Sequence, residues 1–299
     1  MFSCSGTTEK IETTQVFEVQ KGESAQAVGK RLKENGLIKS QLLWYLMCRF
    51  DSTPIKAGTY RVPVDVSQRT IHTILTKVQQ TKVTIPEGST LNAIARLLAS
   101  VQICTEEDFL KATRDTDLLA QYSILGTSFE GFLFPDTYFF SVPCDAQTVI
   151  HAMVNNFMEH FTQNIKPQER YEKVTIASLV EREYKIPEEA PIIAGVFYNR
   201  LAIGMPLQTD ATIEYIITEI QGKPHPERIL YSDLQIDNPY NTYRYKGLPP
   251  GPIGAPGDRA LQAALHPQTH TYLYYRLIDP QAGRHRFSRT FNEHRGISP

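Results

Sequence analysis

The hydrophobic and polar positions in the N-terminal third of the chain follow one pattern twice. A short strand, a glycine turn, a Ser or Thr helix cap and an amphipathic helix begin at Phe17, and the same order begins again at Val83. Each copy continues with a polar turn and a second helix, predicted at residues 40–50 and 105–113. The apolar positions that share one face of the first helices are Ala25, Val28 and Leu32 in the first copy and Leu91, Ile94 and Leu98 in the second. The sequence therefore predicts a βαα unit of about thirty residues that is used twice.

Helices dominate the remainder of the chain, and its strands are short. Strands are predicted at 57–62 and within the aromatic segment 129–140, and a hairpin is predicted at 272–277 with 284–288. Further helices are predicted at 68–78, 146–161, 174–184, 188–203, 209–218 and 258–266, and a short one around Asn292. Segregated helices and hairpins are typical of the α+β class.

The composition indicates a folded protein without a nucleic-acid partner. The chain has 299 residues, of which 41% are hydrophobic, and a formal net charge of −1, so it can bury a core and has no broad basic surface. Its four cysteines form no CxxC pair, and its eight histidines have no HExxH spacing. GxSxG, GxGxxG and Walker motifs do not occur either. We therefore expect neither a metal nor a cofactor.

No segment has the length of a transmembrane helix. The longest strongly apolar run, at residues 42–48, is far shorter than the roughly 20 residues that cross a bilayer. A signal peptide is not recognisable, because residues 3–14 are mostly polar. We therefore expect this chain to be soluble and any N-terminal membrane anchor to be absent from it.

Two carboxylates near the end of one predicted helix are candidates for acid catalysis. On a helical wheel, Glu181 and Glu183 lie at the two edges of an apolar stripe, whereas Thr175, Ser178 and Arg182 face away. A carboxyl at the edge of a buried stripe loses part of its hydration, which raises its pKa and lets it protonate a leaving oxygen. Carboxylates beside an apolar face are more often simply solvated, and the wheel slightly favours Glu183 as the more buried of the two. The pattern alone does not choose between them.

Gln208 and Asp210 are candidates for binding sugar. Their side chains carry groups that form hydrogen bonds with hydroxyls. Thr209 and Asp210 are also equally suited to cap the helix predicted to follow. Capping explains Asp210 about as well as ligand binding does.

The segment 238–257 is dense in Pro, Gly, Tyr and Asn, which predicts a long ordered loop. Its Tyr240, Asn241 and Tyr243 combine aromatic faces with an amide, as sugar-binding sites do. The alternative is a rigid proline-rich loop packed by its own tyrosines. The sequence leaves both interpretations open.

Several segments resemble the endolytic transglycosylase family called MltG or YceG-like. The resemblance extends in the family's order from about residue 17 to residue 294. The matching segments are 130–138 (EGFLFPDTY), 177–183 (ASLVERE), 199–201 (NRL), 204–210 (GMPLQTD), 240–243 (YNTY), 247–253 (GLPPGPI), 263–267 (AALHP) and 287–294 (FSRTFNEH). It implies a LysM-like peptidoglycan-binding subdomain at 14–80, followed by a catalytic domain at 81–299 that contains the second βαα unit at 83–113.

The resemblance also implies a reaction. The family's catalytic glutamate falls on Glu181, which would protonate the oxygen between N-acetylmuramic acid and N-acetylglucosamine. It would then accept the proton of the muramic acid C6 hydroxyl, which closes on C1 to form a 1,6-anhydro end. The residues expected to bind substrate are Glu183, Gln208, Asp210, Tyr240, Asn241 and Tyr243.

The cellular setting follows from the same resemblance. Peptidoglycan strands are the expected substrate, peptidoglycan synthases are the expected protein partners, and limiting the length of nascent strands is the expected role. Family members normally carry an N-terminal transmembrane helix, and the sequence pattern predicts no such helix in these residues. Attachment to the outer face of the inner membrane is therefore implied by kinship alone.

Two other functions remain open. A muramidase-type hydrolase would use Glu181 and Glu183 together, although side chains at i and i+2 point roughly 200° apart on a helix. A non-catalytic cell-wall-binding protein built from the βαα units would bind glycan and leave it uncut.

Overall fold

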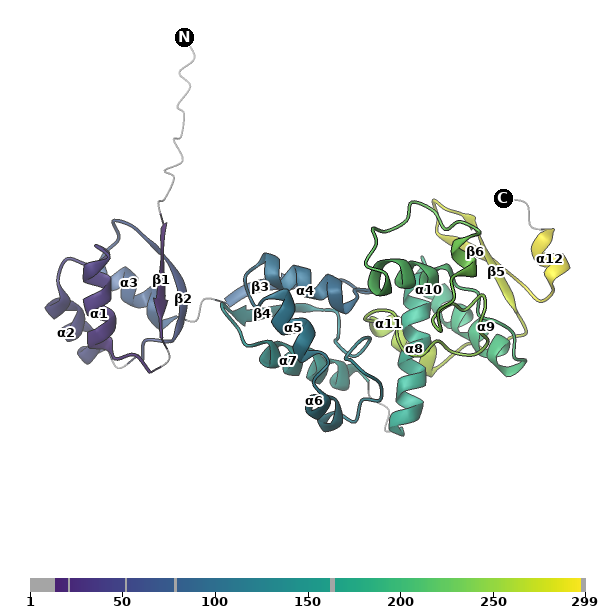
Figure 1. The fold of residues 1–299 in the computed structure, drawn as a ribbon, viewed down its shortest axis with the longest axis horizontal. Helices are drawn as coiled ribbons and strands as arrows, with labels where there is room; N and C mark the ends of the chain where they lie inside the picture. The colour runs from purple at the N-terminus through teal and green to yellow at the C-terminus, as the bar shows by residue number, and fades with distance from the viewer. Residues whose placement is uncertain (1–13, 21, 52, 78–79, 162–164, 297–299) are drawn as a thin grey trace, which may run out of the picture. The chain divides into compact units, whose positions relative to one another are not determined.

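The computed structural model describes residues 14–20, 22–51, 53–77, 80–161 and 165–296 (Figure 1). Within these residues the helices are mostly short and each of the three sheets has two strands, which confirms the predicted α+β class. The chain divides into two compact units. The first comprises the residues up to Lys82 together with Phe139–Cys144, and the second comprises Val83–Tyr138 and the residues from Asp145 onward.

The first unit contains an antiparallel pair of strands, and two helices connect these strands in sequence. β1 (Thr14–Val19) pairs with β2 (Gly58–Pro63). α1 (Ala25–Glu34) and α2 (Gln41–Phe50) lie between the two strands in sequence, and α3 (Gln68–Thr76) follows β2. The element order is therefore βααβα.

Serine caps begin α1 and α2, and the indole of Trp44 packs between these two helices. Ser24 and Ser40 cap α1 and α2, because each hydroxyl accepts a backbone N–H of the first turn. Trp44 of α2 is fully buried, and its indole N–H donates to the carbonyl of Ala25 at 2.9 Å. A Cβ at Gly29 would lie 2.4 Å from the Trp44 ring, so only glycine lets α1 and α2 approach this closely.

A second strand–helix–helix unit follows. It consists of β3 (Gln80–Thr84), α4 (Leu91–Ser100) and α5 (Glu106–Ala112), and β3 pairs with β4 (Thr137–Ser141). The sequence pattern did not indicate α6 (Thr116–Gln121), which lies between α5 and β4. The boundary between the two compact units falls within β3 and β4.

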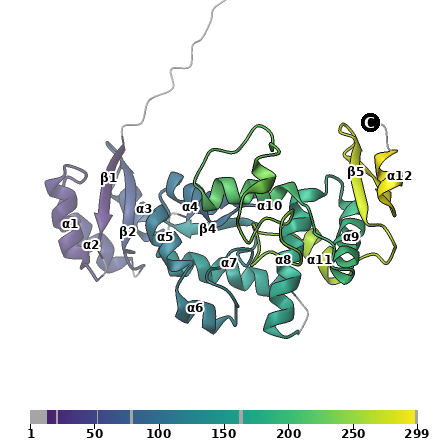
Figure 2. The same cartoon turned by 45° about the vertical axis from the view of Figure 1, so that its right-hand side comes forward.

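The rest of the second unit is mainly helical (Figures 1 and 2). Its elements are α7 (Ala146–His160), α8 (Pro167–Glu183), η1 (Pro187–Glu189), α9 (Ala190–Ala202), α10 (Asp210–Tyr215), η2 (Ile216–Ile220), η3 (Asp233–Gln235), α11 (Asp258–Leu265), the hairpin β5 (Tyr274–Asp279) and β6 (Arg284–Ser288), and α12 (Phe291–Arg295). Among the described residues, none of the helices is both long and apolar enough to cross a membrane.

The central helix α8 packs against α9, α10 and α11 (Figure 2). Because neighbours surround it, every residue from Val174 to Val180 is buried. The prediction that Thr175 and Ser178 face away from the core is therefore wrong. Their hydroxyls are accommodated because each donates to a backbone carbonyl one turn earlier, Thr175 to Tyr171 and Ser178 to Thr175.

Several helices differ from their predicted bounds. α8 begins at Pro167, seven residues before the predicted start at 174. Proline is compatible with this start, because the first turn of a helix does not need its missing N–H. The predicted helix 188–203 begins as the 3₁₀ turn η1 and continues as α9. The predicted helix 209–218 changes after α10 into η2, a π-helix. The predicted end of the helix after β2, at residue 78, lies outside the described residues.

Candidate active site

Glu181 lies in the last turn of α8, where a loop closes over its carboxyl group. Its Oε2 accepts the backbone N–H of Gly257 at 2.9 Å, and its Oε1 accepts the hydroxyl of Tyr184 at 3.3 Å. The side chain is half-buried. Glu181 is therefore held at both oxygens and still has access to solvent.

The loop over Glu181 is fixed by hydrogen bonds to its backbone on two sides. The hydroxyl of Ser178, one helical turn before Glu181, accepts the N–H of Ile253 at 3.0 Å. On the other side, Gly88 donates to the carbonyl of Ala255 and Ala255 donates to the carbonyl of Ser89, each at 2.8 Å. The Pro- and Gly-rich segment is thus an ordered loop, as the sequence predicted, and it lies next to Glu181.

Glu87 places a second carboxyl group beside the same loop. A Cβ built on Gly257 would lie 1.9 Å from Oε1 of Glu87, so the carboxyl of Glu87 occupies the space that a side chain at 257 would need. Glu87 itself is exposed. Sequence reasoning missed this residue, and the one signal for it was its place in the turn of the second βαα unit.

The electrostatic setting of Glu181 favours its protonated form. Burial removes water from the carboxylate and, together with the negative charge of Glu87, raises the pKa of Glu181 to about 7. The N–H of Gly257 and the hydroxyl of Tyr184 act in the opposite direction, because both stabilise the charged form. Near neutral pH this group is therefore able to donate a proton and to take one back.

Glu183 faces a separate pocket, although it lies only two residues further along α8. The pocket has a volume of about 300 Å³ and contains three of the other residues that the sequence singled out. Its lining residues are Glu183, Arg200, Gln208, Asp210, Tyr243, Tyr274, Tyr275, Phe291 and His294. The structure thus brings Glu183, Gln208, Asp210 and Tyr243 together and leaves Glu181 outside this group.

Burial also raises the pKa of Glu183 to about 7, and the charges of Asp210 and Glu214 act in the same direction. A hydrogen bond from Tyr275 opposes this rise. Because the pKa is raised to about 7 for both Glu181 and Glu183, proton affinity does not distinguish the two carboxyls. Their surroundings do, because Glu181 lies under the loop and Glu183 in the pocket.

The helix-capping explanation for Asp210 is wrong. Asp210 is the first residue of α10, and neither it nor Thr209 caps the helix with its side chain. Instead, the carboxylate of Asp210 accepts the hydroxyl of Tyr243 at 2.5 Å. Gln208 has a left-handed backbone with φ 51°, held by its N–H donating to the carbonyl of Thr242 at 3.1 Å. Its side chain is exposed in the pocket.

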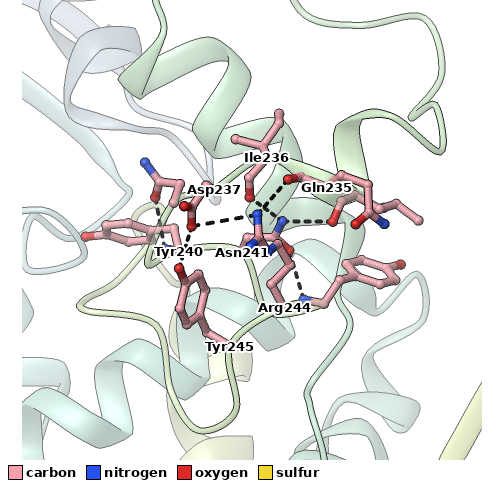
Figure 3. A network of polar contacts seen from close by, with 10 residues as sticks. Gln235, Ile236, Asp237, Tyr240, Asn241, Arg244 and Tyr245 are labelled. Carbon is pink, nitrogen blue, oxygen red and sulfur yellow. Dashed lines mark hydrogen bonds and ion pairs between the residues drawn. The ribbon is translucent and has the colours of Figure 1, made fainter.

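The side chain of Asn241 stabilises the loop through hydrogen bonds to its backbone (Figure 3). It is fully buried, and its amide nitrogen donates to the carbonyls of Leu234 and Ile236 at 3.0 and 2.8 Å. Its amide oxygen accepts the N–H of Tyr243 at 3.0 Å. Because all of these partners belong to the loop region itself, Asn241 offers no surface to a ligand here.

Tyr240 also packs within the protein. Its ring lies 5.1 Å from that of Tyr215, and its side chain is half-buried. Nearby, Tyr245 donates to Asp237 at 2.5 Å and Arg244 donates to the carbonyl of Gln235 at 2.9 Å (Figure 3). Of the three loop residues expected to contact sugar, Tyr243 lines the pocket of Glu183, whereas Tyr240 and Asn241 are not among the lining residues of that pocket.

Comparison with known proteins gives a consistent result. An "Endolytic murein transglycosylase" of Bacillus subtilis is 32% identical over 95% of this chain and 83% of its own length. A Streptococcus pneumoniae protein of the same name is 29% identical. That match covers 92% of this chain and 56% of the length of the S. pneumoniae protein. The crystal structure of a YceG-like protein from Listeria monocytogenes covers 95% of this chain and 99% of its own, with 30% identity and a TM-score of 0.63. Residues 17–297 match the model of the YceG-like family, and this chain belongs to that family.

Proposed function

We propose that this chain is an endolytic murein transglycosylase that cuts the bond between N-acetylmuramic acid and N-acetylglucosamine within peptidoglycan strands. The observation that carries the proposal is the carboxyl of Glu181, which has a pKa of about 7 and is held against the backbone N–H of Gly257. The names of the B. subtilis and S. pneumoniae relatives support the choice of substrate.

The reaction uses one carboxyl twice. Protonated Glu181 gives its proton to the glycosidic oxygen as the bond to C1 of muramic acid breaks. The C6 hydroxyl of the same sugar then attacks C1, and its proton passes to the carboxylate of Glu181. The products are a free N-acetylglucosamine 4-hydroxyl and a 1,6-anhydromuramic acid end, so no water is consumed and the proton on Glu181 is restored.

The surroundings of Glu181 suit both steps. Before bond cleavage, burial and the charge of Glu87 keep the proton on the carboxyl. After cleavage, the hydrogen bonds from Gly257 and Tyr184 stabilise the carboxylate that has formed. Glu87 also places a negative charge near the site, where positive charge develops on the sugar ring in the transition state.

The pocket of Glu183, Gln208, Asp210 and Tyr243 is the proposed binding site for a sugar of the strand. It combines tyrosine rings with exposed carboxylate and amide groups, which suits the two kinds of surface of a pyranose. Tyr240 and Asn241 would serve this site indirectly, by shaping the loop that presents Tyr243.

For the N-terminal unit we propose a role in binding glycan. Its βααβ order and its own core around Trp44 fit a LysM-like module that holds glycan in the cell envelope, next to peptidoglycan synthases whose nascent strands it would shorten. If the module only holds substrate, its removal raises KM more than it lowers kcat.

One observation favours a second candidate, a hydrolase. The carboxyl of Glu87 lies against Gly257, and its negative charge acts on Glu181. As a general base it would activate water to attack C1 and leave a reducing muramic acid end. Glu183 suits this role less well, because it faces the separate pocket.

Digestion of purified sacculi in ¹⁸O-labelled water separates the two reactions. For the transglycosylase, mass spectrometry should find 1,6-anhydromuramic acid ends without label, and fragments of mixed length should appear early. A well-oriented internal hydroxyl outcompetes water at ~55 M, because such groups reach effective molarities of ~10⁵ M or more. Labelled reducing ends would instead identify the hydrolase, and intact sacculi would leave only a binding function.

A further inference from the structure

A second and larger cavity lies beside the loop that holds Glu181. Its volume is about 570 Å³. One wall is formed by the start of α4 and the turn before it, and the other by the end of α10, by η2 and by the segment after η2. The side chains that matter here are those of Arg96, Arg182, Lys223 and His225, with Glu219 as the one acid among the lining residues.

Some of the basic side chains of this cavity have an acidic partner and others do not. Arg182 donates to Glu214 at 2.6 Å, and His225 lies 3.6 Å from the same carboxylate. By contrast, Arg96 and Lys223 are exposed and have no ion-pair partner in the part of the chain that the structure describes. Glu219 accepts the side-chain amide of Asn92 at 2.8 Å, but this neutral partner leaves its negative charge in place. Because Arg96 and Lys223 outnumber this one acid, the cavity presents a net positive charge to a ligand.

The cavity adjoins the proposed catalytic group through two of its lining residues. Arg182 follows Glu181 directly in α8. A Cβ on Gly88 would lie 3.4 Å from Cδ of Arg182 and 3.8 Å from Cγ of Glu181, so Gly88 lies close to both side chains. A substrate group bound in the cavity would therefore belong to a sugar close to the bond that Glu181 cuts.

We propose that this cavity binds a carboxylate of the peptide stem carried by the muramic acid at the cleavage site. The inference rests on the proposed function and names a further part of its substrate. The backbone sugars of the strand are uncharged, and its free carboxylates lie on the peptides attached to muramic acid. A cationic cavity beside the catalytic acid therefore faces the one substituent of the substrate that carries the opposite charge.

Binding measurements on the full chain with Glu181→Gln test the inference without turnover. The probes are soluble peptide-bearing glycan strands and the same strands after their carboxyl groups have been converted to amides. Arg96→Gln with Lys223→Gln should weaken binding of the untreated strands about tenfold, as expected for the loss of two modest ionic contacts. The same pair of substitutions should leave binding of the amidated strands unchanged.

Lys111→Gln with Arg114→Gln is the matched control, because it removes the same charges at exposed positions that do not line the cavity. It should have little effect on either probe. The proposal is overturned if the cavity variant and the control weaken binding alike, or if the cavity variant weakens binding of both probes equally. Cleavage of sacculi by the unaltered chain is measured separately, so a failure of the proposed reaction is distinguishable from a failure of this inference.

Discussion

The backbone N–H of Gly257 donates to Oε2 of Glu181 at 2.9 Å, across 76 residues of sequence. This contact joins the end of the Pro- and Gly-rich loop to the last turn of α8. It stabilises the carboxylate, whereas burial and Glu87 stabilise the protonated acid. The balance between these effects sets the pKa of Glu181 near neutrality and makes the following behaviour testable.

Replacing Glu181 should abolish most of the activity and leave the fold intact. Glu181→Gln keeps an oxygen that accepts the N–H of Gly257 but removes the proton that titrates, so kcat should fall by at least ~10². Glu183→Gln is the matched comparison on the same helix and should cost much less. Release of soluble fragments from sacculi measures activity, and thermal unfolding monitors folding. Normal turnover in Glu181→Gln together with loss in Glu183→Gln would reverse the assignment.

The activity should decline as the pH rises through about 7. The general acid must be protonated, and the pKa of Glu181 is about 7 because of burial and the charge of Glu87, so the competent fraction decreases above that pH. Glu87→Gln removes the neighbouring charge and should move this limb of the kcat/KM profile to lower pH. Glu188→Gln, at an exposed position on η1, should leave the profile in place. An unmoved limb in Glu87→Gln would rule out the coupling.

Gly257→Ala should impair catalysis by displacing Glu87. The added Cβ would lie 1.9 Å from Oε1 of Glu87, although the backbone at 257, with φ −78°, suits alanine. We expect a loss in kcat of roughly tenfold with little change in stability, because the flexible carboxyl of Glu87 moves and disturbs the charge beside Glu181.

Two variants control for this explanation. Gly296→Ala, where the nearest atom to the new Cβ is 3.4 Å away, should be silent. In a Glu87→Ala background the clash no longer exists, so Gly257→Ala should cause almost no additional loss. An equal loss in both backgrounds would place the effect in the loop backbone instead.

Glu130 should make the protein less stable at alkaline pH. Its carboxyl is buried, and burial raises its pKa to about 8. The folded state then holds this proton more tightly than the unfolded state, so the free energy of unfolding decreases as the pH rises from about 4.5 to about 8. Glu130→Gln should therefore stabilise the protein at pH 8 by ~1–3 kcal/mol and change little at pH 4.5. Denaturant unfolding at both pH values measures this, and a stabilisation that is equal at both would contradict the linkage.

Local features of this protein were readable from the sequence. The Ser and Thr caps at positions 24 and 90 start their helices as predicted, because a cap acts within one turn of its own backbone. Ser40 and Thr105, predicted as the first residues of the second helices, cap those helices. The α+β class and the family were recognisable for the same reason, since periodicity and motifs are properties of short segments. The loop at 238–257 was predicted as ordered, from its Pro, Gly and Tyr content.

Only the tertiary structure decided which groups meet. A helical wheel treats one face of α8 as exposed, yet α8 packs against α9, α10 and α11, and Thr175 and Ser178 are buried. Asn241 lies inside its loop rather than on it, which composition does not reveal. Glu87 reaches Gly257, and Glu183 faces away from Glu181 into a different pocket, through contacts between segments far apart in the chain. Proton affinity and accessibility depend on such long-range neighbours, whereas the pattern of a single helix reports only on its own residues.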